Sequence, residues 1–204
     1  MIRRLPTRKP GEGPHVTPDA ARHYPRNSAR VDAPGGLGGN PPESHILGNM
    51  LIRRAATQAD APLIAAHRKA MYAALDKSPE TALDAMSVSF EPWVVRVMGE
   101  GKYFGWVISD AGKPVASAGL LILDWPPDPL DPQGERRGYL LYVFVEPHYR
   151  KRGLAHDLVE MCLAEARHQG IQVIALHGSD AGRPLYESFG FRASDEMVFV
   201  LPEG

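Results

Sequence analysis

The 204-residue sequence contains a single cysteine and no long apolar segment. One cysteine excludes a disulfide framework, and Cys162 falls on the apolar side of a predicted helix, where a small core residue is the ordinary interpretation. No apolar run approaches the roughly 20 residues that span a bilayer, and no short apolar segment follows the basic N-terminus as a secretory signal requires. We therefore expect a cytoplasmic protein with no membrane partner.

Several motifs of other enzyme classes are missing as well. The sequence has no metal-ligand pattern at standard spacing, so no metal is expected. It has no Gly-x-x-x-x-Gly-Lys loop and no Gly-x-Gly-x-x-Gly after a strand, which argues against nucleotide-binding folds. Residues 178–182 lack the spacing of a serine-hydrolase nucleophile elbow.

The first 49 residues differ from the rest in composition. They contain eight Pro and seven Gly but only seven residues drawn from Leu, Ile, Val and Phe, too few to offset the entropy of ordering the chain. Their seven Lys and Arg against four Asp and Glu give +3, and the whole chain carries −1, which leaves −4 from residue 50 onward. We predict a disordered extension over 1–49 and a folded domain over 50–204. The basic residues are scattered, so neither a nucleic-acid arm nor an organelle address is favoured.

The rest of the sequence is organised around residues 139–155. Residues 139–145 form an almost wholly apolar run that predicts a buried strand, and Pro147 ends it. Arg150, Lys151 and Arg152 then precede Gly153, and apolar residues recur at helical spacing until Gly170. The free N–H groups and the dipole of a helix start favour an anion, and a glycine lets that anion approach the backbone. A diphosphate is the expected ligand.

The remaining patterns alternate between helices and strands. Strands are expected at 51–54, 103–109, 115–123, 171–177 and 197–201, and helices from Thr57 to about Leu75, from Ser78 onward and at 182–188. Gly112 falls in the predicted turn of a hairpin, where a positive φ is needed. This order predicts one α+β domain with a mixed sheet.

Two separated motifs together point to one family. Arg150-x-x-Gly153-x-Ala155 resembles the acyl-CoA signature of the GNAT superfamily of N-acetyltransferases. Ser179-x-x-Gly182-x-x-x-Tyr186-x-x-x-Gly190-Phe191 is similar to the second characteristic segment of that family, in the same order along the chain. The resemblance implies a mixed sheet with splayed central strands and transfer of an acetyl group from acetyl-CoA to a primary amine in a ternary complex. It also suggests Met50 as the natural start.

The resemblance further implies particular site residues. Backbone groups of Phe144 and Val145 are expected to bind the pantetheine arm, and Tyr186 is expected to protonate the departing thiolate. Ser179 stands where many relatives carry an Asn that bonds the pantetheine amide. The diphosphate is expected at the basic turn and the helix start, on Arg150, Lys151, Arg152, Gly153, Leu154, Ala155 and His156.

The base that deprotonates the amine is not fixed by the sequence, because the strand 138–145 holds no carboxylate or His. We take Glu146 as the candidate, with three alternatives: His177, the acids of the 124–135 loop, and a water held by Tyr139 or Tyr142. Without a workable base, the domain would be an acyl-CoA-binding sensor rather than an enzyme.

The acceptor is a small or peptide amine, with no nucleic-acid partner, and a homodimer is left open. In the superfamily the two helices before the hairpin lie over the acceptor. Their candidate contacts are Met71, Tyr72, Met86, Phe90 and Trp93. The loop around Trp125 is a second candidate, because its aspartates suit a cationic amine.

Overall fold

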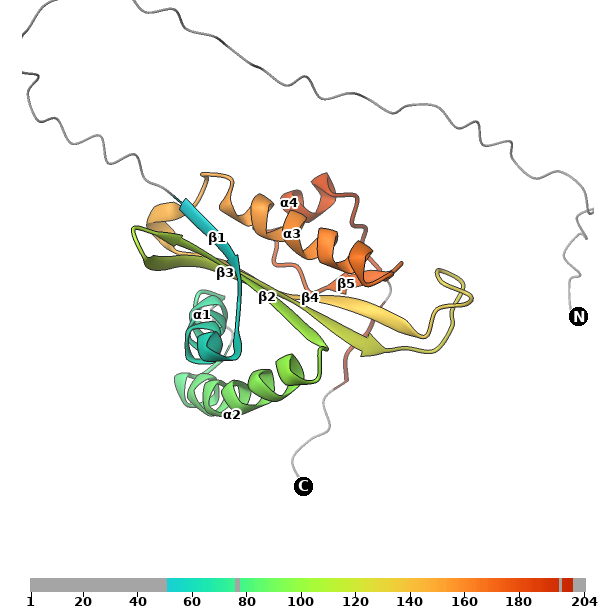
Figure 1. The fold of residues 1–204 in the computed structure, drawn as a ribbon, viewed down its shortest axis with the longest axis horizontal. Coiled ribbons are helices and arrows are strands. Elements are labelled where there is room, and N and C mark those ends of the chain that lie inside the picture. Colours follow the sequence, from blue (N-terminus) through green and yellow to red (C-terminus); the bar gives the residue numbers. More distant parts are fainter. Residues whose placement is uncertain (1–50, 76–77, 195, 200–204) are drawn as a thin grey trace, which may run out of the picture. The chain divides into compact units, whose positions relative to one another are not determined.

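The computed structural model describes residues 51–75, 78–194 and 196–199. The predicted extension over 1–49 and the suggested start at Met50 lie outside these residues. The described chain forms five strands, four α-helices and two 3₁₀ turns (Figure 1). In chain order these are β1 (Leu51–Ala55), η1 (Gln58–Asp60), α1 (Ala61–Ala73), α2 (Glu80–Gly99), β2 (Tyr103–Asp110), β3 (Lys113–Asp124), β4 (Arg136–Val145), η2 (Pro147–Tyr149), α3 (Leu154–His168), β5 (Ile174–Leu176) and α4 (Arg183–Ser188).

The strands form one sheet in the order β1-β2-β3-β4-β5. The first four pair antiparallel with their neighbours, and β5 pairs parallel with β4 after the crossover through α3. The tight turn between β2 and β3 has positive φ at both Ala111 (46°) and Gly112 (80°), as the hairpin prediction requires at Gly112. The predicted α+β domain with a mixed sheet is confirmed.

Helices cover both faces of the sheet. Figure 1 shows α1 and α2 on one face and α3 and α4 on the other. On the α3 face, Leu154, Leu158 and Cys162 are almost fully buried against strand residues, which confirms the interpretation of Cys162 as a core residue. On the opposite face, Ile64 and Val94 join α1 and α2 over Phe144. Helices α1, α2 and α3 each bury apolar residues on the side that faces the sheet.

A bulge in β4 changes which residues face the α1 and α2 layer. The β3–β4 register passes from Ala118↔Val143 to Gly119↔Leu141, so Tyr142 is the extra residue. Its side chain is buried with Tyr103 of β2, and the two hydroxyls are hydrogen bonded. A Cβ on Gly119 would lie 2.2 Å from the Tyr103 hydroxyl oxygen. Gly119 therefore provides the room in which the Tyr103 ring crosses β3 to reach the bulge.

The last part of the predicted fold differs from the structure. The strand predicted over 171–177 is confined to Ile174–Leu176. The strand predicted over 197–201 is not formed in its described part: residues 197–199 have no regular structure, and their side chains are 74–93% exposed. A strand needs a partner along its length, and β5 offers an edge of only three residues.

Candidate functional site

Strand β4 has an open edge over its second half. It pairs with β5 only through Gly138, Tyr139 and Leu140, although β4 continues to Val145. On its other side β4 stays paired with β3 as far as Val145. Among the described residues, no strand pairs with this edge beyond Leu140, and the backbone there is available to an extended ligand.

The register indicates which backbone groups face the open edge. Glu146 N–H donates to the Val115 carbonyl at 2.9 Å, so Glu146 is directed toward β3. Antiparallel partners alternate along the ladder, so the backbone of Phe144 also faces β3, and the backbones of Val143 and Val145 face outward. Of the two predicted pantetheine residues, Val145 thus presents its main chain to the opening. Phe144 instead packs its ring on His67, with centroids 4.4 Å apart.

Helix α3 starts directly beyond this edge, at a glycine with positive φ. Gly153 is the N-cap residue, with φ 83°, and no side chain caps the helix. The first intrahelical bond runs from Asp157 N–H to the Gly153 carbonyl, so the earlier N–H groups have no intrahelical partner. Lys151 also has a positive φ, of 59°, and left-handed residues in such a turn form an anion-binding concavity. A Cβ on Gly153 would meet nothing within 4 Å, so the space beside these groups is open.

Basic side chains surround the helix start in different ways. Arg150, Lys151 and Arg152 are all exposed. Arg150 Nε donates to the outward-facing carbonyl of Val145 at 3.1 Å and so ties the turn to the strand end. The Arg152 guanidinium lies 5.1 Å from the centre of the Tyr149 ring. The predicted diphosphate residues are therefore contiguous around one helix start.

The first turn of α3 contains both buried and exposed residues. Leu154 is buried and Ala155 is half-buried, so their backbone groups are held in place by core packing. His156 is exposed, and its ring stacks on Phe189, with centroids 4.5 Å apart. Asp157, the acidic residue of this turn, is paired with Arg53. This ion pair offsets a negative charge that would otherwise weaken anion binding at the helix start.

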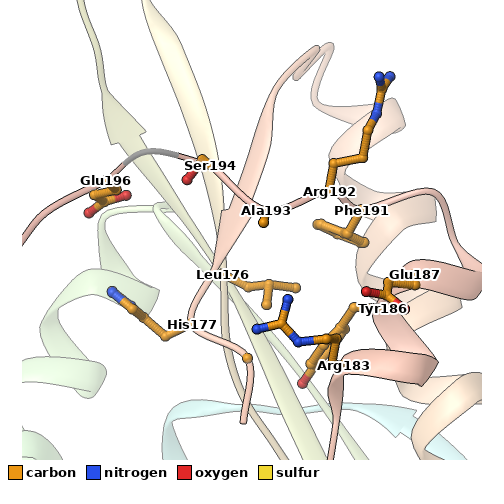
Figure 2. A pocket seen from close by; sticks show the side chains of 11 residues that line it. Leu176, His177, Arg183, Tyr186, Glu187, Phe191, Arg192, Ala193, Ser194 and Glu196 are labelled. Atoms are coloured by element: carbon orange, nitrogen blue, oxygen red, sulfur yellow. The ribbon is translucent and has the colours of Figure 1, made fainter. Parts of the chain in front are cut away.

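The opposite side of the opening is formed by the residues after β5 and by α4. Ser179 Oγ accepts a hydrogen bond from Gly182 N–H at 3.2 Å, so this hydroxyl is partly used inside the turn. Tyr186 is half-buried, and its ring lies close to the backbone of Gly178. Burial raises the pKa of the Tyr186 phenol. Tyr186 and His177 both line a cavity of about 240 Å³ between α4, the residues after β5, residues 191–194 and Glu196 (Figure 2).

A side-chain pair closes the point where β4 and β5 separate. The Tyr139 hydroxyl is hydrogen bonded to Nδ1 of His177, and the two ring centroids are 5.6 Å apart. Burial, followed by the charges of Glu196 and Tyr72, raises the pKa of Tyr139. Tyr72 of α1 and Glu196 near the C-terminus therefore lie in the electrostatic neighbourhood of this pair. We call Tyr139 and His177 the fork pair.

The structure separates the candidate bases. Glu146 lies at the far end of the open edge, roughly 20 Å from Tyr139 at about 3.3 Å per residue, and close enough to His67 for its charge to act on that imidazole. The 124–135 loop lies at the other end of β4, before Arg136. The Arg137 guanidinium stacks 4.0 Å from the centre of the Trp125 ring and pairs with Asp128 at 2.6 Å. Arg137 thus already engages Trp125 and Asp128, and the cationic-amine pocket considered from the sequence stays a prediction.

Two residues of α1 have polar contacts that carried no functional signal in the sequence. His67 is 6% exposed, and its Nδ1 lies 2.8 Å from Ser117 Oγ. Burial lowers the pKa of His67, although the charge of Glu146 opposes the shift. Arg68 places its guanidinium against Phe90 of α2, one of the predicted acceptor contacts. Helical spacing places His67 on the inner face of α1, and nothing in the pattern distinguishes Arg68 from a surface residue.

In the described part of the chain, no three or more His, Cys, Asp or Glu side chains are grouped as metal ligands would be. Within the same ranges, no helix has the length and apolar character that a bilayer crossing requires.

Comparisons with known proteins agree with this geometry. A glucosamine 6-phosphate N-acetyltransferase from Trypanosoma brucei brucei is 33% identical over 88 residues, which are 43% of this chain and 56% of that protein. The crystal structure of a GCN5-related N-acetyltransferase from Ralstonia eutropha JMP134 is 34% identical, with a TM-score of 0.70, over 74% of this chain and 98% of that one. A predicted acetyltransferase from Clostridium acetobutylicum, crystallised with acetyl-CoA, shares the fold at 24% identity and a TM-score of 0.68, over 74% and 96%.

The extent of these matches determines what they establish. The chain spans about half the length of the curated relatives it matches, from 40% to 56%. Residues 67–191 match the model of the acetyltransferase (GNAT) family, and this segment is more than half of the chain and holds both sequence motifs. The chain belongs to the GNAT family of acetyltransferases.

Proposed function

We propose that residues 50–204 form an N-acetyltransferase domain that transfers an acetyl group from acetyl-CoA to a primary amine, by direct attack in a ternary complex. One observation carries the proposal. The open backbone edge of β4 leads directly to the uncapped helix start at Gly153, within the segment that matches the family. A ligand whose extended arm is joined to a diphosphate fits these two features in the order in which they occur.

The diphosphate is assigned to the start of α3. Its oxygens would accept from the first-turn N–H groups, including those of Ala155 and His156, and the exposed basic residues at 150–152 add long-range attraction. The arm would then run back along β4 and pair with the outward backbone groups of Val145 and Val143 as an added strand does. Ser179 on the opposite side retains its hydroxyl hydrogen as a donor toward the arm.

This direction places the thioester near the fork pair. The acyl end of the ligand lies farthest from the diphosphate, so it approaches the point where β4 and β5 separate at Leu140. Glu146 is at the diphosphate end, where a carboxylate is badly placed to deprotonate an amine. We therefore assign the base role to His177, held by the Tyr139 hydroxyl, rather than to Glu146.

The reaction needs a neutral amine. An alkylamine with a pKa near 10.4 is neutral in about one molecule per thousand at pH 7, which corresponds to a penalty of about 4 kcal/mol. His177 accepts the proton, directly or through a water, as the amine nitrogen forms its bond to the acetyl carbonyl carbon. The carbon–sulfur bond then breaks and releases the thiolate of CoA.

Tyr186 is assigned to the leaving thiolate. A phenol with a raised pKa does not give up its proton completely to a thiolate of pKa about 8.5. We therefore assign Tyr186 a strong hydrogen bond to the sulfur, which stabilises the developing negative charge.

The proposal is tested by following thiol release from acetyl-CoA with and without amines. Release that requires both the protein and an amine supports it, and the acetylated amine should appear in equal amount by mass spectrometry. The competing acyl-CoA sensor predicts binding of acetyl-CoA without amine-dependent release. A panel of small amines, amino acids, aminoglycosides and peptides would identify the acceptor, and the name of one relative suggests amino sugars.

A further inference from the structure

The guanidinium of Arg68 lies between α1 and α2, where it stacks on aromatic rings of both helices. Its central carbon is 4.8 Å from the centre of the Phe90 ring and 5.0 Å from that of Tyr72. Its strongest polar contact is a long hydrogen bond of 3.4 Å to the Tyr72 hydroxyl. The Nε atom is buried, and no atom of the described residues is its hydrogen-bond partner. None of the ion pairs found in residues 51–75, 78–194 and 196–199 includes Arg68.

Aromatic rings satisfy only part of what a guanidinium requires. The ring faces attract its charge, but the N–H groups lie in the guanidinium plane and need oxygen acceptors. A buried donor without an acceptor is costly, and arginine cannot relieve this cost by losing its proton. Two parallel N–H groups match the two oxygens of a carboxylate or phosphate, which makes such a group the natural partner.

The position of Arg68 identifies the substrate to which this oxyanion belongs. Burial raises the pKa of Tyr142, and the charge of Arg68 opposes that rise, so Arg68 lies near the β4 bulge. Phe90, on which Arg68 stacks, meets Tyr142 edge to face with centroids 6.4 Å apart. Tyr72, its other neighbour, acts electrostatically on Tyr139 of the fork pair. Arg68 therefore lies beside the proposed thioester end of β4, away from the helix start assigned to the CoA diphosphate.

We propose that the acceptor is a primary amine that also carries a carboxylate or a phosphate, and that Arg68 binds this oxyanion. The inference rests on the proposed acetyl transfer. In the competing explanation, Arg68 is a structural clamp whose stacking on Phe90 and Tyr72 only holds α1 against α2.

The first test uses the wild-type protein and pairs of amines that differ in one anionic group. α-Amino acids are compared with their carboxamides, and O-phosphoethanolamine with ethanolamine. The amine of a carboxamide is less basic and thus more often neutral, so chemistry alone favours the amide. We expect kcat/KM to be at least about 10-fold higher for the anionic member of one pair, and the pair that shows it distinguishes carboxylate from phosphate. Equal or better turnover of the neutral member in both pairs would overturn the inference.

The second test uses three variants of α1. Arg68→Gln should lower kcat/KM for the anionic acceptor by about 10- to 100-fold, with a smaller loss for neutral amines, and leave the Kd for acetyl-CoA unchanged. Arg68→Lys keeps the charge but loses the planar fork, so an intermediate loss is expected. Lys69→Gln is the matched control, because it removes a cation from the next position, where Lys69 pairs with the exposed Asp84. It should change none of these values.

The outcomes separate this inference from the proposed function. Equal losses for anionic and neutral amines in Arg68→Gln would show a clamp and overturn the inference. Turnover confined to neutral amines would overturn it while the transferase function stands. Binding of acetyl-CoA with no turnover of any amine would overturn the proposed function itself. If Arg68→Gln does not fold, the wild-type preference and Arg68→Lys decide the question.

Discussion

Substitution of Gly153 by glutamate tests the assignment of the helix start most sharply. The glycine has φ 83°, and a Cβ there would meet nothing within 4 Å. The conformational cost of a side chain in this region is therefore about 1 to 2 kcal/mol of stability, without any packing clash. The effect on the ligand is separate, because the new carboxylate would stand beside the diphosphate.

The size of that effect follows from Coulomb's law. Two like charges about 4 Å apart repel by about 1 kcal/mol in water and about 4 kcal/mol near a protein surface. Gly153→Glu should therefore raise the Kd for acetyl-CoA at least about tenfold, which corresponds to about 1.4 kcal/mol. Isothermal titration calorimetry measures the Kd, and thermal unfolding measures the stability.

Gly170 supplies a matched control at the other end of the same helix. It has φ 70°, and a Cβ there would likewise meet nothing within 4 Å. Gly170→Glu should lose at least as much stability as Gly153→Glu, since a negative charge is unfavourable at a helix C-terminus. Its affinity for acetyl-CoA should not change. Equal affinities in the two variants would refute the diphosphate assignment, and Gly153→Asn, which tolerates a positive φ, would show how much of any loss is due to strain.

Three further predictions concern the reacting groups and a buried histidine. Tyr186→Phe should lower kcat about 10-fold, the value of one hydrogen bond in the transition state, with the Kd for acetyl-CoA unchanged; equal turnover would remove its role. His177→Ala should lower kcat/KM at pH 7 about 100-fold. The difference from the wild type should become smaller as the pH approaches the pKa of the amine. The same loss in Glu146→Gln would instead assign the role of base to Glu146. Below pH 6.5, the ordinary pKa of a histidine, the free energy of unfolding should decrease as pH falls. The pKa of His67 is lowered in the folded state, so the unfolded chain binds more protons there. His67→Gln should reduce this slope in denaturant titrations, and an unchanged slope would contradict the burial argument.

The parts of the site that sequence reasoning found are those made by adjacent residues. The order of apolar strand, basic turn and Gly153 predicts the strand end and the helix start, because backbone geometry there depends on neighbours in the chain. The opening beside the strand was implied only by the family resemblance. The sequence predicted that this position needs a glycine, and Gly153 has a positive φ. The glycine is needed there for its backbone conformation, since no other atom would crowd a side chain. Tyr186 was found by its spacing to Gly190 and Phe191, and its catalytic role remains a prediction.

The acceptor side could not be read in the same way. Arg68 meets Phe90 through packing of α1 on α2, and Tyr142 meets Tyr103 only because a bulge turns β4 and Gly119 leaves room. Such contacts depend on the register of the strands and on where the helices pack. The spacing of apolar residues in the sequence does not predict either of these. The strand predicted over 197–201 is not formed in its described part. Residues 197–199 have a strand-forming composition, but composition does not supply a partner, and β5 presents an edge of only three residues.

The central claim is that the start of α3 and the open edge of β4 bind acyl-CoA. Titration of the wild-type protein with acetyl-CoA and with free CoA in a calorimeter tests it most directly. The account predicts heat at a stoichiometry of one for both ligands, since the diphosphate and the arm are common to them. No heat from either ligand at millimolar concentration would contradict it.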